Sequence, residues 1–209
     1  MTQQVITVSP GESIRSAVEK LREYHIRQLP VVEGNEVIGI ITDRDLRQAS
    51  SLSRLLVEDG PQREELESFL DRRTVEEVMS HKVVTVAPTD TIEDVARILH
   101  DYKIGGVPVV EGRELVGIIT GSDILEAFLE VMGIGVPSSR LEVVLEDRPG
   151  QLAQLTAIIK EFHINIVSLV TLPQEEPGQR TIILRLNTIY PNPIIEALQQ
   201  AGFQVVSPC

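Results

Sequence analysis

Residues 39–46 read G-I-I-T-D-R-D-L, and residues 117–124 read G-I-I-T-G-S-D-I. Two more phrases recur at the same offset of 78 residues: L-P-V-V-E-G at 29–34 returns as V-P-V-V-E-G at 107–112, and V-I-T-V-S-P at 5–10 returns as V-V-T-V-A-P at 83–88. Because three separate blocks share one offset without a gap, the first two thirds of the chain is an internal duplication.

Each copy predicts the same order of elements, βαββα. A β-branched run that ends before a proline predicts a first strand at 5–8 and at 83–86. Apolar residues at i, i+3, i+4 and i+7 then predict a helix, and these are Ile14, Ala17, Val18 and Leu21 in the first copy and Ile92, Val95, Ala96 and Leu99 in the second. Two strands follow, at 29–32 and 37–41 in the first copy, joined through Gly34-Asn35 as a hairpin. A second helix begins at the Thr-x-x-Asp phrase.

The remaining segments complete the domain organisation. We predict a first repeat at 1–50, a charged helical linker at 51–73, a second repeat at 74–132 and a Gly/Pro/Ser linker at 133–139. From 140 to 209 the pattern changes to strand, helix, two strands, helix and strand, which is the ferredoxin-like βαββαβ order. The fold class is therefore α+β.

Composition excludes several classes of function. Lys plus Arg number 19 against 31 Asp plus Glu, which gives a net charge of −12 and argues against a nucleic-acid binder or a polybasic membrane module. The one cysteine is Cys209, so an internal disulfide framework and a Cys zinc cluster are excluded. With no long apolar run and no signal-peptide pattern, we expect a soluble, cytoplasmic protein.

The duplicated unit resembles a CBS domain, because each h-P-V-V strand is followed by G-h-h-T-x-x-D-h. Two such units in tandem resemble a Bateman module. The tail resembles an ACT domain through D-R-P-G-Q-L at 147–152 and I-N-I-V-S-L at 164–169. A CBS pair followed by an ACT domain is similar to the AcuB-type acetoin-utilisation proteins of bacteria, which implies a regulator without a catalytic domain.

The CBS resemblance implies a shared site for an adenosyl ligand: an adenine nucleotide such as AMP or ATP, or S-adenosylmethionine. Asp45 and Asp123 stand where the family places the carboxylate that accepts hydrogen bonds from both ribose hydroxyls. The other implied residues are Thr42 and Thr120 for the ribose or a phosphate, and Thr7, Leu29, Thr85 and Val107 as walls for the adenine. We expect Asp123 to face Thr7 and Leu29, and Asp45 to face Thr85 and Val107.

A phosphate in an acidic protein needs a local cation. Arg27 resembles a position where such proteins use Arg or His, and its counterpart in the second copy is Gly105. Arg44 likewise has Ser122 as its counterpart. The two sites are therefore expected to differ.

A purely structural interpretation stays open for both modules. Thr-x-x-Asp also has the spacing of a helix cap, which needs no ligand. In the ACT-like tail, Gly150 permits close approach of a ligand carboxylate to a helix N-terminus, and Asp147 and Asn165 are candidates for the ammonium of an amino acid. D-R-P-G is equally an ordinary turn into a helix.

We therefore predict a ligand-sensing regulatory protein that forms a homodimer and acts on a partner enzyme. The alternative is an adaptor that only mediates assembly. An enzyme is disfavoured because the chain has no G-x-S-x-G, no P-loop and no activated nucleophile, so no catalytic residue and no cofactor is assigned. His25, His81, His100 and His163 lack metal-ligand spacing, so no metal site is assigned either.

The two copies differ in the residues that precede them. T-V-E-E-V at 74–78 comes before Met79, whereas Met1, its counterpart, has nothing before it in this sequence. We expect either a natural start further upstream or the loss of this segment. Apolar surface that Val75 and Val78 would cover is then left open, close to the pocket that uses Thr7.

Overall fold

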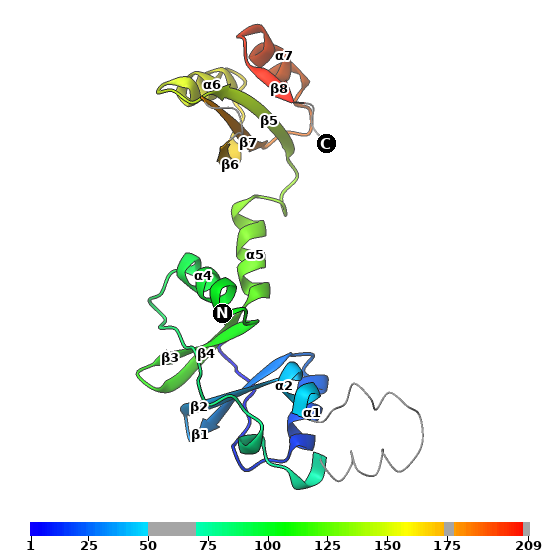
Figure 1. Ribbon diagram of the computed structural model, residues 1–209. Helices are drawn as coiled ribbons and strands as arrows, with labels where there is room; N and C mark the ends of the chain where they lie inside the picture. Colours follow the sequence, from blue (N-terminus) through cyan, green and yellow to red (C-terminus); the bar gives the residue numbers. More distant parts are fainter. Residues whose placement is uncertain (50–69, 174–177, 207–209) are drawn as a thin grey trace. The chain divides into compact units, whose positions relative to one another are not determined.

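A computed structural model describes residues 1–49, 70–173 and 178–206. The chain divides into two compact units, Met1–Ile124 and Leu125–Cys209 (Figure 1). The predicted helical linker at 51–73 lies outside the described residues except for its last part. There Leu70 packs against the core of the first repeat.

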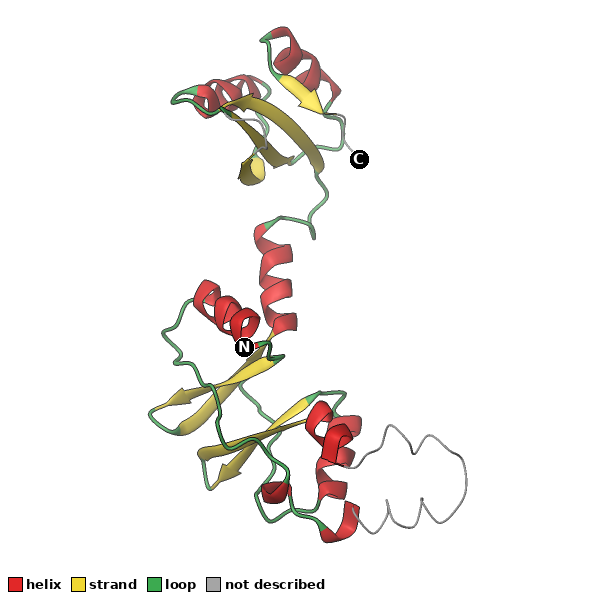
Figure 2. Cartoon of the chain, viewed as in Figure 1, coloured by secondary structure: helices red, strands yellow, loops and turns green. Residues whose placement is uncertain are grey.

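The first unit contains the duplication. Its elements are α1 (Ile14–Glu23), β1 (Gln28–Glu33), β2 (Glu36–Thr42), α2 (Asp43–Ala49), the 3-10 helix η2 (Val75–Glu77), α4 (Ile92–Tyr102), β3 (Gly106–Glu111), β4 (Glu114–Thr120) and the start of α5 (Gly121–Val131), as Figure 2 shows. Strands β1, β2, β4 and β3 form one antiparallel sheet in that order, and β2 meets β4 at the pair Glu36–Glu114. The predicted hairpins are confirmed, and Gly34 and Gly112 take the positive φ values of 64° and 66° that their tight turns need.

The first strand of each copy is the one element predicted wrongly. Residues 5–8 and 83–86 form only isolated bridges with β1 and β3, at Val8–Val31 and Val86–Val109. The residues that precede these runs pair instead with the other repeat: Thr2 pairs with Ile118, and Ser80 pairs with Ile40. Because such a short segment divides its backbone hydrogen bonds between two repeats, it forms no continuous ladder with either.

The segment before the second repeat completes the core of the first. Ser13 pairs with Thr74, and the amide of Val75 donates to the carbonyl of Glu12 at 2.9 Å. Val75 is fully buried among repeat-1 side chains. Met79 also joins this core, and a Cβ at Gly39 would lie 2.3 Å from its Sδ, so a larger residue there would require the Met79 side chain to move.

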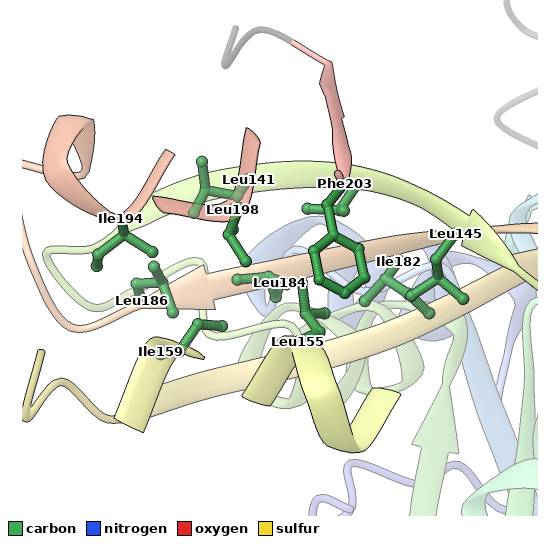
Figure 3. Packing of buried hydrophobic residues seen from close by; sticks show 11 residues of the cluster. Leu141, Leu145, Leu155, Ile159, Ile182, Leu184, Leu186, Ile194, Leu198 and Phe203 are labelled. Atoms are coloured by element: carbon green, nitrogen blue, oxygen red, sulfur yellow. The ribbon is translucent and has the colours of Figure 1, made fainter. Parts of the chain in front are cut away.

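The second unit has the βαββαβ order predicted from the sequence. Its elements are β5 (Ser139–Glu146), α6 (Gln151–Glu161), β6 (Ile166–Pro173), β7 (Gln179–Leu186), α7 (Asn192–Gln200) and β8 (Gln204–Val206). The antiparallel sheet has the order β6-β7-β5-β8. Figure 3 shows its core, where side chains of α6 and α7 meet those of β5 and β7. Among the described residues, no helix is both long and apolar enough to cross a membrane.

Candidate ligand sites

The Thr-x-x-Asp phrase of the first repeat forms a closed hydrogen-bonded corner between β2 and α2. The hydroxyl and the amide of Thr42 donate to Oδ2 of Asp45 at 2.6 and 2.9 Å, and the Asp45 amide donates back to the hydroxyl at 3.2 Å. The amide of Asp43 donates to the carbonyl of Arg27 at 3.0 Å, which places the start of β1 beside this turn. We call residues 27–28 and 42–45 the Asp45 corner.

The second repeat builds the same arrangement, the Asp123 corner, from residues 105–106 and 120–123. The Thr120 hydroxyl and amide donate to Oδ2 of Asp123 at 2.6 and 2.8 Å. Oδ1 lies 3.7 Å from the Met1 amino group. Partial burial by itself raises the pKa of Asp123, but the hydrogen bonds from Thr120 and the charge of the Met1 amino group outweigh it, so the pKa is lowered. Asp123 is therefore an ionised acceptor near neutral pH.

A third Thr-x-x-Asp pair shows that such bonds do not by themselves mark a ligand site. At the start of α4, the Thr91 hydroxyl donates to Asp94 Oδ2 at 2.8 Å and accepts from the Asp94 amide at 3.2 Å. This pair caps a helix on an exposed surface. The two corners differ from this pair in that the amides of Thr42 and Thr120 also donate to Oδ2 of Asp45 and Asp123. The described residues place no hydrogen-bond donor on Oδ1 of Asp45.

The topology links each corner to the opposite repeat. The first segment runs from Met1, beside Asp123, to Val8, which pairs with Val31 of β1. Thr7 lies on this segment. Thr85 lies on the equivalent segment of the second repeat, which runs from Ser80, paired with Ile40 of β2, to Val86, paired with Val109 of β3. A site shared between the repeats requires such a crossing. That Thr7 and Thr85 face Asp123 and Asp45 stays a prediction. Leu29 and Val107 have 0% exposed surface, and that they line a ligand site stays a prediction.

The predicted difference between the two corners is present in the structure. Arg27 and Arg44 are exposed, and neither forms an ion pair with the described residues; their counterparts Gly105 and Ser122 carry no charge. Gly105 accepts from the amide of Gly121 at 3.0 Å, as Arg27 accepts from that of Asp43. The cations therefore belong to the Asp45 corner.

Gln28 is a candidate site residue that the sequence analysis missed. It is 9% exposed, and its Nε2 is buried without a hydrogen-bond partner among the described residues. The side chain crosses to the other repeat, where a Cβ at Gly106 would lie 1.9 Å from Nε2. Gln28 occupies the first position of β1 and Gly106 the first of β3, so an alignment of the two copies would have revealed a large residue opposite a glycine.

The three residues predicted for the ACT-like tail do not meet within one chain. Asp147 follows Glu146, which pairs with Gln179, whereas Ile166, next to Asn165, pairs with Leu186. Glu146 and Leu186 lie at opposite ends of the β5–β7 ladder. One copy of this unit therefore presents the Asp147 turn and Asn165 separately.

Asp147 also has a partner that the sequence did not reveal. Arg180 donates to its two carboxylate oxygens at 3.0 and 2.9 Å, and these hydrogen bonds lower the pKa of Asp147. Gly150 takes a φ of 92° immediately before α6, and its side-chain position is open. The side chain of Asn165 makes no hydrogen bond to the described residues.

Two cavities lie in this second unit. One of about 440 Å³ is lined by residues at the end of α6 and the start of β6, including Lys160, His163 and Asn165. The other, of about 310 Å³, lies beside Arg148 and Gln151, close to the D-R-P-G turn. Neither touches the Thr-x-x-Asp corners. Within the described ranges, no group of three or more His, Cys, Asp or Glu side chains is arranged to hold a metal ion.

Comparison with known proteins identifies both modules. The CBS domain model matches residues 1–52 and 75–130, more than half of the chain, and the ACT domain model matches 139–203. The CBS domain-containing protein YhcV of Bacillus subtilis is 31% identical over 124 residues, which cover 59% of this chain and 79% of YhcV. Inosine-5'-monophosphate dehydrogenase of Korarchaeum cryptofilum is 36% identical over 123 residues, but these are 58% of this chain and only 22% of the enzyme.

Solved structures give the same result. The CBS domain pair of protein MJ0100, solved with 5'-methylthioadenosine and S-adenosyl-L-methionine, is 30% identical with a TM-score of 0.50, and the match covers 61% of this chain and 90% of that one. A putative acetoin utilization protein (AcuB) from Vibrio cholerae is 29% identical with a TM-score of 0.52, over 65% of this chain and 90% of that one. The duplicated Thr-x-x-Asp corners, the βαββαβ tail and these matches together show that the chain belongs to the CBS domain family, with an ACT domain behind its CBS pair.

Proposed function

We propose that this protein is a non-catalytic sensor whose CBS pair binds an adenine nucleotide or S-adenosylmethionine and controls a partner enzyme. The observation that carries the proposal is the pair of matching corners, in which Asp45 and Asp123 are each anchored through Oδ2. A ribose diol donates to a carboxylate in charge-assisted hydrogen bonds. Oδ1 of Asp45 has no donor among the described residues, whereas Oδ1 of Asp123 lies 3.7 Å from the Met1 amino group, with which a ribose would share it. The adenosyl ligands in the MJ0100 CBS pair support this ligand class.

Ligand-dependent thermal stability tests the proposal. A ligand that binds only the folded protein adds about 2.7 kcal/mol at a hundredfold excess over Kd. The Asp45→Ala, Asp123→Ala double variant loses two charged acceptors, each worth about 1.5–3 kcal/mol, so AMP, ATP and S-adenosylmethionine should no longer raise its melting temperature. An unchanged ligand shift in the double variant rejects the ribose assignment.

Asp94→Ala is the matched control, because it removes a carboxylate that accepts from a Thr hydroxyl at a helix start, as in the corners, without touching either corner. Loss of such a hydrogen bond costs about 0.5–1.5 kcal/mol of stability. The control should therefore melt earlier than wild type but retain the full ligand shift. If it loses the shift as well, the effect of the double variant comes from general destabilisation.

For the ACT domain we propose amino-acid binding at a site made by two copies of the chain. Asn165 of one copy would hold the ammonium, and the turn at Gly150 of the other would hold the carboxylate at the start of α6. Screening the twenty amino acids by thermal shift tests this, with Asn165→Ala as the variant that removes the response. Resemblance to the Vibrio cholerae protein supports a role in acetoin metabolism.

An assembly adaptor is the second candidate. The helix α5 has no buried residue, and Leu125, Phe128 and Leu129 are 57%, 55% and 40% exposed at i, i+3 and i+4. An apolar helix face of this kind supports a homodimer. If no adenosyl ligand and no amino acid changes the melting temperature, assembly is the function that remains.

A further inference from the structure

We infer that the two corners bind different ligands: a phosphorylated nucleotide at the Asp45 corner and a nucleoside without phosphate at the Asp123 corner. This inference rests on the proposed function and assigns a ligand class to each corner. Three positions that differ in charge between the repeats carry it, together with the amide of Gln28.

Most charge differences near the corners favour an anion at Asp45; the exceptions are Asp43, whose counterpart is Gly121, and Lys103, whose counterpart is His25. Arg27 and Arg44 lie within the Asp45 corner, are exposed, and form no ion pair with the described residues. Lys82 follows two residues after Ser80, which exchanges backbone hydrogen bonds of 3.1 and 2.9 Å with Ile40 of β2. The counterparts of these three cations are Gly105, Ser122 and Gln4.

The helices that begin at the corners extend this contrast. Residues 43–49 hold two Asp and two Arg, whose charges cancel, whereas 121–127 hold Asp123 and Glu126 without a cation. The Met1 amino group near Asp123 offsets only one of these two carboxylates. A phosphate at the Asp123 corner would therefore lie in a negative field, and at the Asp45 corner in a positive one.

The backbone of Gln28 belongs to the Asp45 corner, but its side chain crosses to Gly106 and gives the Asp123 corner a neutral donor in place of a cation. Its buried Nε2 lies against Gly106, which is paired with Thr120 in the β3–β4 ladder. A buried amide without an acceptor is costly, and a hydroxyl or ring nitrogen of a ligand satisfies it without adding charge. At three equivalent positions the Asp45 corner has side chains and the Asp123 corner has glycines. The pairs are Arg27 and Gly105, Gln28 and Gly106, and Asp43 and Gly121.

The chain permits an exchange of the decisive charge. A Cβ at Gly105 would meet only Gln28 Oε1, at 3.7 Å, an ordinary contact, and its φ is not positive. Arg27 is exposed, so its removal leaves no buried gap. The double variant Arg27→Gly, Gly105→Arg therefore moves one cation from the first corner to the second without disturbing either core.

Calorimetric titration with AMP and with adenosine tests the inference. In wild type, both should bind, AMP affinity should fall with added salt, and adenosine affinity should not. Asp45→Asn should weaken AMP about tenfold or more and leave adenosine unchanged, and Asp123→Asn should do the reverse. Asp94→Asn serves as the control and should change neither.

The exchange variant tests the role of the cation while AMP binding at the Asp45 corner is already weakened. In the Asp45→Asn background, Arg27→Gly, Gly105→Arg should raise AMP affinity about tenfold, because the Asp123 corner gains a cation. Equal losses of AMP and adenosine in either Asp variant overturn the inference, as does an unchanged AMP affinity in the exchange variant. Binding of only one of the two ligands to wild type also overturns it. If neither binds wild type, the proposed function itself fails.

Discussion

Ile14 and Ile92 begin equivalent helices, α1 and α4, yet Ile14 has no exposed surface and Ile92 is 39% exposed. In the first repeat, the Ile14 amide donates to the carbonyl of Arg73 at 3.0 Å, and the adjoining Val75 completes the core. None of the described residues fills the corresponding place beside Ile92. The second repeat therefore has an exposed apolar position at Ile92 where the first repeat has a buried one.

Adding residues T-V-E-E-V before Met1 should raise the melting temperature, because the added valines can cover the face beside Ile92 as 74–78 cover the first repeat. Full burial of one such side chain contributes about 1.5–3 kcal/mol. Thermal unfolding of the two chains measures the difference. The control extension T-D-E-E-D has the same length without the apolar groups. Equal melting temperatures for both extensions would show that the face beside Ile92 does not accept the segment.

Light scattering at micromolar concentration should give twice the mass of one chain. Phe128 is 55% exposed on α5, so Phe128→Asp should lower the mass to that of a monomer by placing a charge in the apolar contact. Glu126→Gln, on the same helix, should remain dimeric. A wild-type monomer contradicts the homodimer, and a dimeric Phe128→Asp variant places the contact elsewhere.

Glu12 should make stability depend on pH in the acid range. Burial alone raises the pKa of Glu12, but hydrogen bonds from Lys20, Ser16 and Ser9 outweigh it and lower the pKa to about 2. Since the folded pKa lies below the unfolded value of 4.5, this contribution is complete above pH 4.5 and disappears as pH falls towards 2. Urea unfolding at pH 7, 4.5 and 3 measures it. The Glu12→Gln variant should be less stable at pH 7, and the difference should shrink at pH 3; a constant difference refutes the assignment.

A chain that ends at residue 137 should still unfold in one cooperative transition. The CBS repeats and the ACT domain have separate clusters of buried side chains, so removal of 138–209 opens neither repeat core. Circular dichroism during heating checks this expectation. A broad, non-cooperative loss of signal would mean that the CBS pair needs the ACT domain to fold.

The elements that the sequence predicts well are those determined by local patterns. Apolar spacing alone located α1 and α4, and Gly34-Asn35 located a hairpin, because each pattern acts within a few residues. The short runs at 5–8 and 83–86 misled the prediction, since β-branched composition does not reveal that Thr2 and Ser80 pair with the opposite repeat.

The candidate sites divide in the same way. Thr42 and Asp45 are three residues apart, so their hydrogen bonds follow from local spacing. The pairing of Asp147 with Arg180 joins a turn residue to a residue of β7 that is 33 positions away, and no local pattern encodes it. Gln28 escaped notice because its importance depends on Gly106, a neighbour supplied by the other repeat.

The exchange of the first segments gives the CBS pair the symmetry of a dimer within one chain. Thr2 pairs with Ile118 and Ser80 with Ile40, so the beginning of each repeat is bound by the other repeat. In a dimer of identical chains, equivalent positions must carry the same residue. Here both halves lie in one sequence, so Arg27 and Gly105 can differ at equivalent positions.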